Sequence, residues 1–104
     1  MKSKRTKACE IKPKVREAVE ERDRHACVFC GSPNARGEAH IVRRSQGGLG
    51  IEQNILCVCR HCHHEFDEGK NRELYMKVAI THMKEHYPDW NMSDLIFKKG
   101  YEYD

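Results

Sequence analysis

The stretches Cys27-Val-Phe-Cys30 and Cys59-Arg-His-Cys62 decide the fold of this chain. Each is a Cys-x-x-Cys knuckle, and two such knuckles supply the four thiolates of a closed tetrahedral zinc site. Four sulfur ligands leave zinc no open coordination position. The sequence therefore predicts a structural zinc held by Cys27, Cys30, Cys59 and Cys62, and we expect any chemistry between or just after the knuckles.

The composition indicates a small protein with a small hydrophobic core. The chain has 104 residues, of which 38% are hydrophobic and 34% charged. A chain of this size buries only about 65% of its unfolded surface, so a bound metal would add stability that the core lacks. The N-terminus has no apolar export segment, and no stretch approaches the ~18 apolar residues of a membrane span. We expect a cytoplasmic protein with no membrane partner, where paired cysteines favour zinc over disulfides.

Positive charge is concentrated at the N-terminus. The net charge is only +3, yet residues 1–16 contain seven Lys or Arg side chains and one acid, Glu10. We predict a flexible basic arm over residues 1–12. Such an arm can neutralise phosphates and release counterions, and a solvated disordered tail is the alternative interpretation.

Turn residues and hydrophobic spacing predict the elements. We expect helices over 13–24, from Arg60 to Gly69 and over 71–86, with strands over 38–43 and 54–58. The strands are joined by a segment that contains three glycines, and Pro88 ends the last helix. The predicted fold class is therefore α+β.

The predicted domain organisation follows from these elements. Residues 13–104 should form a single domain, with a core at 27–69 and a C-terminal helix and tail at 70–104. Apolar residues at helical spacing in the last helix are expected to pack in the core.

Four pieces of the sequence carry a family resemblance. They are Cys27-Val-Phe-Cys30, Glu38-Ala-His-Ile-Val-Arg-Arg-Ser-Gln-Gly-Gly48, Asn54-Ile-Leu-Cys57 and Cys59-Arg-His-Cys-His-His-Glu-Phe-Asp-Glu-Gly69. In this order they resemble the HNH endonucleases, also called ββα-metal or His-Me finger nucleases, and in particular phage-type members with a four-cysteine zinc. The resemblance implies a ββα-metal core flanked by N- and C-terminal helices, and metal-dependent hydrolysis of DNA phosphodiester bonds. It also implies a phage setting in a host-cell cytoplasm, with packaging proteins among the partners the chain could meet.

The resemblance assigns catalytic roles to His40 and Asn54. His40 takes the position of the general base that deprotonates water, and a neutral imidazole with a pKa near ~6.5 can accept a proton at physiological pH. Asn54 takes the position whose amide holds the hairpin loop so that the base is oriented. Taken alone, each residue could instead be an ordinary packing histidine or turn asparagine.

His63 and Asp67 are expected to hold a second, catalytic metal. They are four residues apart on a predicted helix and share one face. A nitrogen and an oxygen ligand suit Mg²⁺, Mn²⁺, Ni²⁺ or Zn²⁺, and an isolated surface hydrogen bond is the alternative. Many HNH enzymes have a further ligand directly before the base, where this chain has Ala39. Glu38 is the predicted substitute ligand, because alternate residues of a strand point to the same side.

Arg43 and Arg44 are predicted to contact DNA phosphates near the site. A domain this small has little surface for reading bases, so we expect binding dominated by phosphates with weak sequence preference. Oligomeric state has no sequence signal here.

Other functions fit the sequence less well. Cys59-Arg-His-Cys62-His63 matches the haem-attachment pattern, but haem would leave the first knuckle without a role. Zinc deaminases use H-x-E followed by P-C-x-x-C, whereas Glu38-Ala39-His40 has the reverse order and no proline precedes either cysteine pair. A thioredoxin-like role lacks the βαβ pattern. The main alternative is a non-catalytic nucleic-acid-binding zinc module, a decayed nuclease that lost its ligand at Ala39.

Overall fold

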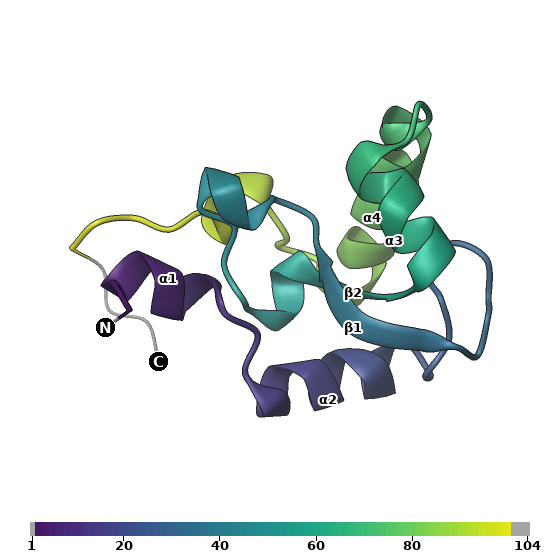
Figure 1. The fold of residues 1–104 in the computed structure, drawn as a ribbon, viewed down its shortest axis with the longest axis horizontal. Helices are drawn as coiled ribbons and strands as arrows, with labels where there is room; N and C mark the ends of the chain where they lie inside the picture. Colours follow the sequence, from purple (N-terminus) through teal and green to yellow (C-terminus); the bar gives the residue numbers. More distant parts are fainter. Residues whose placement is uncertain (1, 101–104) are drawn as a thin grey trace.

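A two-stranded antiparallel sheet lies between two helical layers (Figure 1). Strand β1 (Ala35–His40) pairs with β2 (Ile55–Cys59). Helix α2 (Pro13–Arg22) covers one face, and α3 (Arg60–Glu68) and α4 (Arg72–His86) cover the other. The structure is a computed structural model that describes residues 2–100. These residues form the small α+β fold that the sequence predicts.

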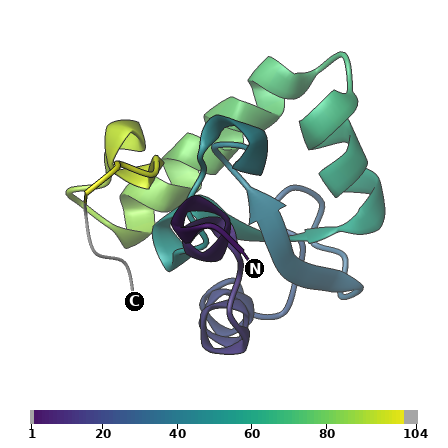
Figure 2. The same cartoon turned by 60° about the vertical axis from the view of Figure 1, so that its left-hand side comes forward.

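The core is divided by the hairpin into two apolar clusters. All five residues of β2 are buried, and successive side chains point to opposite faces. On the face toward α3 and α4, Leu56 packs with Phe66 and Met83. On the face toward α2, Ile55 packs with Val19. Figure 2 shows this layering from a second direction, with α2 on one side of the hairpin and the α3–α4 pair on the other.

The first strand differs in position from its prediction. It was expected over 38–43 but spans Ala35–His40, and its partner spans Ile55–Cys59 rather than 54–58. The strand ends early because the backbone N–H and C=O of Val42 both bond to the side chain of Asn54 instead of to a neighbouring strand. At its other end Ala35 pairs with Cys59, which brings the second knuckle beside the first.

The helix boundaries follow local backbone chemistry. Helix α2 ends at Arg22 rather than at residue 24, because Arg24 and His25 adopt left-handed φ values of 58° and 55°. Helix α3 ends at Glu68, and Gly69 follows with φ −78° rather than in the left-handed region. Glycine is required at position 69 because the backbone of α3 lies close to it: a Cβ there would be 2.5 Å from the backbone oxygen of Glu65.

The N-terminal segment contains a helix, in the region where the sequence predicts a flexible arm over 1–12. Helix α1 (Lys4–Cys9) forms within it, with Ser3 accepting a hydrogen bond from the Thr6 N–H as its N-cap. The N–H of Gly50 donates to Ala8 O at 2.9 Å, and Cys9 is buried. The segment is therefore part of the folded domain, because its backbone pairs with the loop between the strands.

A buried polar cluster ties α2 to the hairpin and to α4. The carboxylate of Asp23, whose side chain is 1% exposed, accepts hydrogen bonds from Arg22, from the Cys57 N–H and from His82. The Arg22 guanidinium also donates to Ile55 O at 2.7 Å. Burial raises the pKa of Asp23, but the hydrogen bonds from Arg22 and His82 outweigh it and hold that pKa well below its usual range.

In the described part of the chain, three short 3-10 helices shape the loops: η1 (Arg44–Gln46), η2 (Glu52–Asn54) and η3 (Met92–Leu95). The C-terminal segment packs back on the loop that joins the strands, since Leu49 N–H donates to Leu95 O and Phe97 N–H donates to Gly47 O. Among residues 2–100, no helix has the length and apolar character needed to cross a bilayer.

Candidate metal centre and histidine cleft

The four knuckle cysteines converge on one point. Their sulfur atoms all lie within 4.8 Å of one another, so the structure places Cys27, Cys30, Cys59 and Cys62 in position to bind a metal ion. A tetrahedral zinc with Zn–S bonds of about 2.3 Å separates its sulfurs by about 3.8 Å. The distance from Cys30 Sγ to Cys59 Sγ is 3.6 Å, which fits such an ion.

The thiols of this group differ in acidity. The backbone N–H of Cys62 donates to Cys59 Sγ at 3.4 Å and lowers the pKa of the Cys59 thiol to about 7. Burial raises the pKa of the Cys62 thiol far above its usual value. Thiolates this close repel one another, so a bound dication would allow all four to ionise.

Outside this metal centre, a group of histidine, carboxylate and arginine side chains lines a cleft of about 590 Å³. The cleft lies where the end of β1, the start of the following loop and the exposed side of α3 meet. We call it the His40 cleft, and it is lined by Ile11, Arg16, Glu38, His40, Arg43, Arg44, Ser45, His63, Asp67 and Glu68. All the residues predicted from sequence for catalysis, catalytic metal or phosphate binding line it, except Asn54.

His40 is held in one orientation at this cleft. It is 9% exposed, and its Nε2 lies 3.0 Å from the carbonyl oxygen of Cys9. A carbonyl can only accept, so Nε2 carries the proton and the Nδ1 lone pair stays free to take one. Burial lowers the pKa of His40, and nearby Arg44 adds to this effect, which keeps the imidazole neutral at physiological pH.

Asn54 lies behind the cleft and is 0% exposed. Its Oδ1 accepts from the Val42 N–H at 2.8 Å, and its Nδ2 donates to Val42 O at 3.2 Å and to Leu49 O at 2.8 Å. These three hydrogen bonds link both ends of the loop that follows His40. They are the bonds that an orienting role for this amide requires.

His63 and Asp67 are in direct contact on α3. Their Nε2 and Oδ2 atoms are 3.2 Å apart, close to the roughly 3.0 Å between adjacent ligands of an octahedral ion with bonds of about 2.1 Å. The two side chains are about one third exposed to solvent, at 32% and 40%. The pair could therefore hold one cation, with its other positions open.

Glu38 does not complete a three-ligand site. Within residues 2–100, the four knuckle cysteines are the only group of three or more His, Cys, Asp or Glu side chains close enough to hold a metal. Glu38 falls at a β-bulge between Gly37 and Ala39, and its carboxylate lies 3.7 Å from the Arg16 guanidinium. Ala39 itself is 0% exposed and faces the core cluster that includes Phe66 of α3.

The three arginines of the cleft differ in their partners. Arg43 donates to the backbone oxygen of Asp67, which ties it to the end of α3. Arg44 is exposed at the start of η1. Arg16 reaches the cleft from α2, and its Nε is buried with no hydrogen-bond partner among the described residues.

Two elements of the cleft have no signal in the sequence motif. Arg16 belongs to a helix outside the motif, and the Cys9 carbonyl belongs to the segment predicted to be flexible. Neither could be recognised from residue type, because one is a lone arginine in a charged helix and the other is a backbone atom. The burial of Cys9 in the structure shows that its segment packs against the domain, but residue type alone does not predict that burial.

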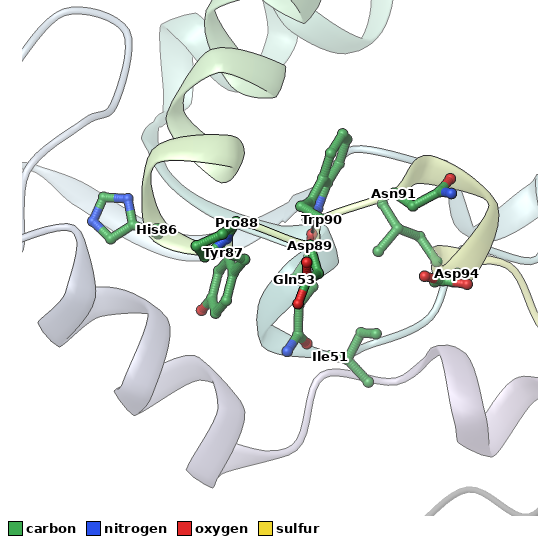
Figure 3. A pocket seen from close by; sticks show the side chains of 10 residues that line it. Ile51, Gln53, His86, Tyr87, Pro88, Asp89, Trp90, Asn91 and Asp94 are labelled. Carbon is green, nitrogen blue, oxygen red and sulfur yellow. Dashed lines mark hydrogen bonds between the residues drawn. The ribbon is translucent and has the colours of Figure 1, made fainter.

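A different pocket, of about 480 Å³, lies between η2 and the segment after α4 (Figure 3). Its labelled side chains include Tyr87, Trp90, Asp89 and Asp94, and the indole N–H of Trp90 donates to Gln53 O at 2.7 Å. None of its lining residues is Lys or Arg. Acidic side chains repel phosphates, so this pocket is unsuited to a phosphodiester.

Comparison with known proteins gives one partial likeness. No protein-family model matches the chain, and no solved structure does. The chain is similar to anaredoxin from Nostoc sp. strain PCC 7120, with 26% identity over 58 residues, which are 55% of this chain and 76% of anaredoxin. This likeness is too low to place the chain in a family, so the function has to be argued from the metal centre and the His40 cleft.

Proposed function

We propose that the chain is a metal-dependent HNH endonuclease that hydrolyses phosphodiester bonds of DNA, with His40 as the general base. The observation that carries the proposal is the Nε2 contact to Cys9 O at 3.0 Å. It leaves Nδ1 as the proton acceptor in a cleft that also contains a cation-ligand pair and three arginines. A phosphodiesterase needs a base, a Lewis acid and cationic groups for the phosphate, and this cleft offers a candidate for each.

In the proposed reaction, Nδ1 of His40 takes a proton from water as the oxygen attacks phosphorus. The bond to the 3′ oxygen breaks, and that oxygen takes a proton from solvent water, leaving a 5′-phosphate and a 3′-hydroxyl. The lowered pKa of His40, caused mainly by its burial, keeps the imidazole in its basic form before the attack. The Nε2–H bond to Cys9 O then stabilises the imidazolium that forms, because a carbonyl oxygen accepts more strongly from a charged donor.

The remaining residues hold the substrate and the geometry. His63 and Asp67 would bind a divalent cation, which when present acts as a Lewis acid on a phosphate oxygen and the leaving 3′ oxygen. Arg44 would contact phosphate oxygens, since it is exposed at the cleft, and the guanidinium of Arg16, which lies beside Glu38 in the lining, would add positive charge. Asn54 keeps the loop after His40 in place.

Zinc in the four-cysteine centre would have a structural role. A four-sulfur site has no open position for substrate, and tetrahedral sulfur sites suit zinc or iron. Elemental analysis of purified protein separates these two metals, and an iron centre would also absorb visible light. One zinc per chain is the expected result.

The alternative function is a non-catalytic DNA-binding zinc module. It is favoured by one observation: the cleft offers two metal ligands, His63 and Asp67, because Glu38 lies against Arg16 and Ala39 has no donor atom. Two ligands give weaker affinity than three, so cleavage would depend on millimolar cation or on phosphate oxygens completing the site.

Plasmid cleavage tests both functions. Zinc-loaded protein is incubated with supercoiled DNA and Mg²⁺, Mn²⁺, Ni²⁺, added Zn²⁺ or no further metal, beside His40→Ala and the control His64→Ala. His64 is an exposed histidine of α3 that does not line the cleft. Metal-dependent cleavage that is lost in His40→Ala and kept in His64→Ala supports the nuclease. Equal cleavage by both variants would refute the assignment of His40, and DNA binding without cleavage under every metal would favour the binding module.

A further inference from the structure

A second hollow adjoins the His40 cleft on the side of the zinc knuckles. Its volume is about 780 Å³, and it shares two lining residues with the cleft, Glu38 and His63. We call it the Arg60 hollow. Because the two hollows have these residues in common, they adjoin one another at Glu38 and His63.

The Arg60 hollow contains two arginines that have no role in the site described above. Arg36 projects from β1, and Arg60 is the first residue of α3. Both are exposed. Within residues 2–100, neither guanidinium is within ion-pair distance of a carboxylate, in contrast to Arg16 and Arg22. Guanidinium groups without a carboxylate are free to take phosphate oxygens in a bidentate manner.

The knuckles fix where these arginines lie. Arg60 falls between Cys59 and Cys62, two of the metal-binding residues. Arg36 is paired in the sheet with Val58, one residue from the Ala35–Cys59 pair. The metal centre and the sheet pairing therefore set the positions of both backbones.

We propose that the Arg60 hollow is a second phosphate-binding subsite, in which Arg36 and Arg60 contact a backbone phosphate that flanks the bond held in the His40 cleft. The proposal rests on the DNA-directed function argued above and adds a route for the strand, from Arg44 past His63 to Arg60. Asn34, also in the lining, adds an amide that can bond to a phosphate or sugar oxygen. The ligand class is the DNA sugar-phosphate backbone, so the subsite contributes affinity without sequence preference.

The test measures how DNA binding depends on salt. Zinc-loaded protein carrying His40→Ala, so that the DNA stays intact, is titrated into a fluorescent duplex at KCl concentrations from about 50 to 200 mM. The same titration is made after adding Arg36→Ala and Arg60→Ala together. The matched control adds Lys70→Ala and Lys84→Ala, which remove equal charge from two exposed residues that line neither hollow.

Each lost phosphate contact reduces the slope of log K against log salt by about 0.9. The arginine pair, which contacts one phosphate, should therefore reduce the slope by about 0.9, and the lysine pair should leave it nearly unchanged. An unchanged slope in the arginine pair would overturn the subsite. An equal reduction in both pairs would do so as well, because the effect would then come from net charge alone.

The result is independent of catalysis. If wild-type protein fails to cleave plasmid under every metal but the arginine pair reduces the slope, the nuclease function fails and the subsite stands. If cleavage depends on His40 but the slope is unaffected, the nuclease stands and the subsite fails. Circular dichroism and zinc content of both double variants show that the knuckles remain folded.

Discussion

Replacing Asn54 should destabilise the protein by about 3 kcal/mol. Its side chain makes three hydrogen bonds, to Val42 N, Val42 O and Leu49 O, and it is 0% exposed. Each such bond contributes about 1 kcal/mol net, and the backbone groups left behind lie in residues only 8% and 3% exposed, where water replaces the amide poorly. For a domain of this size, 1 kcal/mol shifts Tm by about 4–8 °C, so Asn54→Ala should reduce Tm by about 12–24 °C.

The variant Asn54→Asp tests the donor role of Asn54 Nδ2 by itself. The aspartate keeps the acceptor for the Val42 N–H, but it puts an oxygen where Nδ2 now donates to Leu49 O at 2.8 Å. Two facing oxygens repel, so at neutral pH this variant should be at least as unstable as Asn54→Ala. Its carboxyl pKa should be raised in the folded state, and stability should therefore return as pH falls, because the protonated form can donate again.

Thermal and urea unfolding of zinc-loaded protein measure both variants, with Gln53→Ala as the control. Gln53 is the neighbouring amide residue and lies at the other pocket. If Asn54→Ala unfolds within about 1 kcal/mol of Gln53→Ala, the three hydrogen bonds do not hold the loop as described. If Asn54→Asp shows no relative gain in acid, the donor role of Nδ2 is wrong.

Four further outcomes are expected. Asp23→Asn leaves the buried Arg22 charge without its partner and should cost about 3–5 kcal/mol in urea unfolding at pH 7. Because the pKa of Asp23 is lowered by its hydrogen bonds, its contribution is present above the unfolded pKa of about 3.9 and is lost as pH falls below it. Gly50→Ala places a Cβ 1.9 Å from a backbone oxygen next to the carbonyl that orients His40, and it should reduce single-turnover cleavage on the order of 10²-fold. Since burial and Arg44 lower the pKa of His40, the acid limb of cleavage should lie below pH ~6.5 and move upward in Arg44→Ala, as a pH–rate profile can show. A chelator that removes the knuckle metal should abolish the cooperative thermal transition, which calorimetry follows.

The knuckles and the order of elements could be predicted from sequence because they depend on local spacing. Cys-x-x-Cys pairs specify a metal geometry directly, and all four cysteines converge as predicted. The three predicted helices also follow from periodicity and differ only at their ends. Element identity was therefore more predictable than the exact residues at which each element ends.

The features that could not be predicted from sequence depend on contacts between segments that are far apart in the chain. The early end of β1 results from the Asn54 side chain, twelve residues beyond Val42, replacing a strand partner. Helix α1 is stabilised by the backbone of Gly50, which local charge patterns in residues 1–12 do not reveal. Glu38 was predicted as a metal ligand from strand alternation, and the bulge at its position and the nearby Arg16 leave it outside any three-ligand group of the described chain. The predicted roles of His40, His63 and Asp67 await the experiments above.

His40 donates a hydrogen bond to the Cys9 carbonyl, which lies outside the hairpin and the long helices. The part of the chain needed to orient His40 is therefore longer than the part needed to form that core. A protein shortened to begin at residue 13 would keep α2, the hairpin, the four cysteines and both long helices. It would lose the carbonyl oxygen that fixes the tautomer of His40, so the imidazole would populate both neutral forms and present its Nδ1 lone pair for only part of the time. Shortened proteins that fold and bind zinc should then cleave slowly even at saturating DNA, where the loss of the basic side chains before residue 13 no longer limits binding.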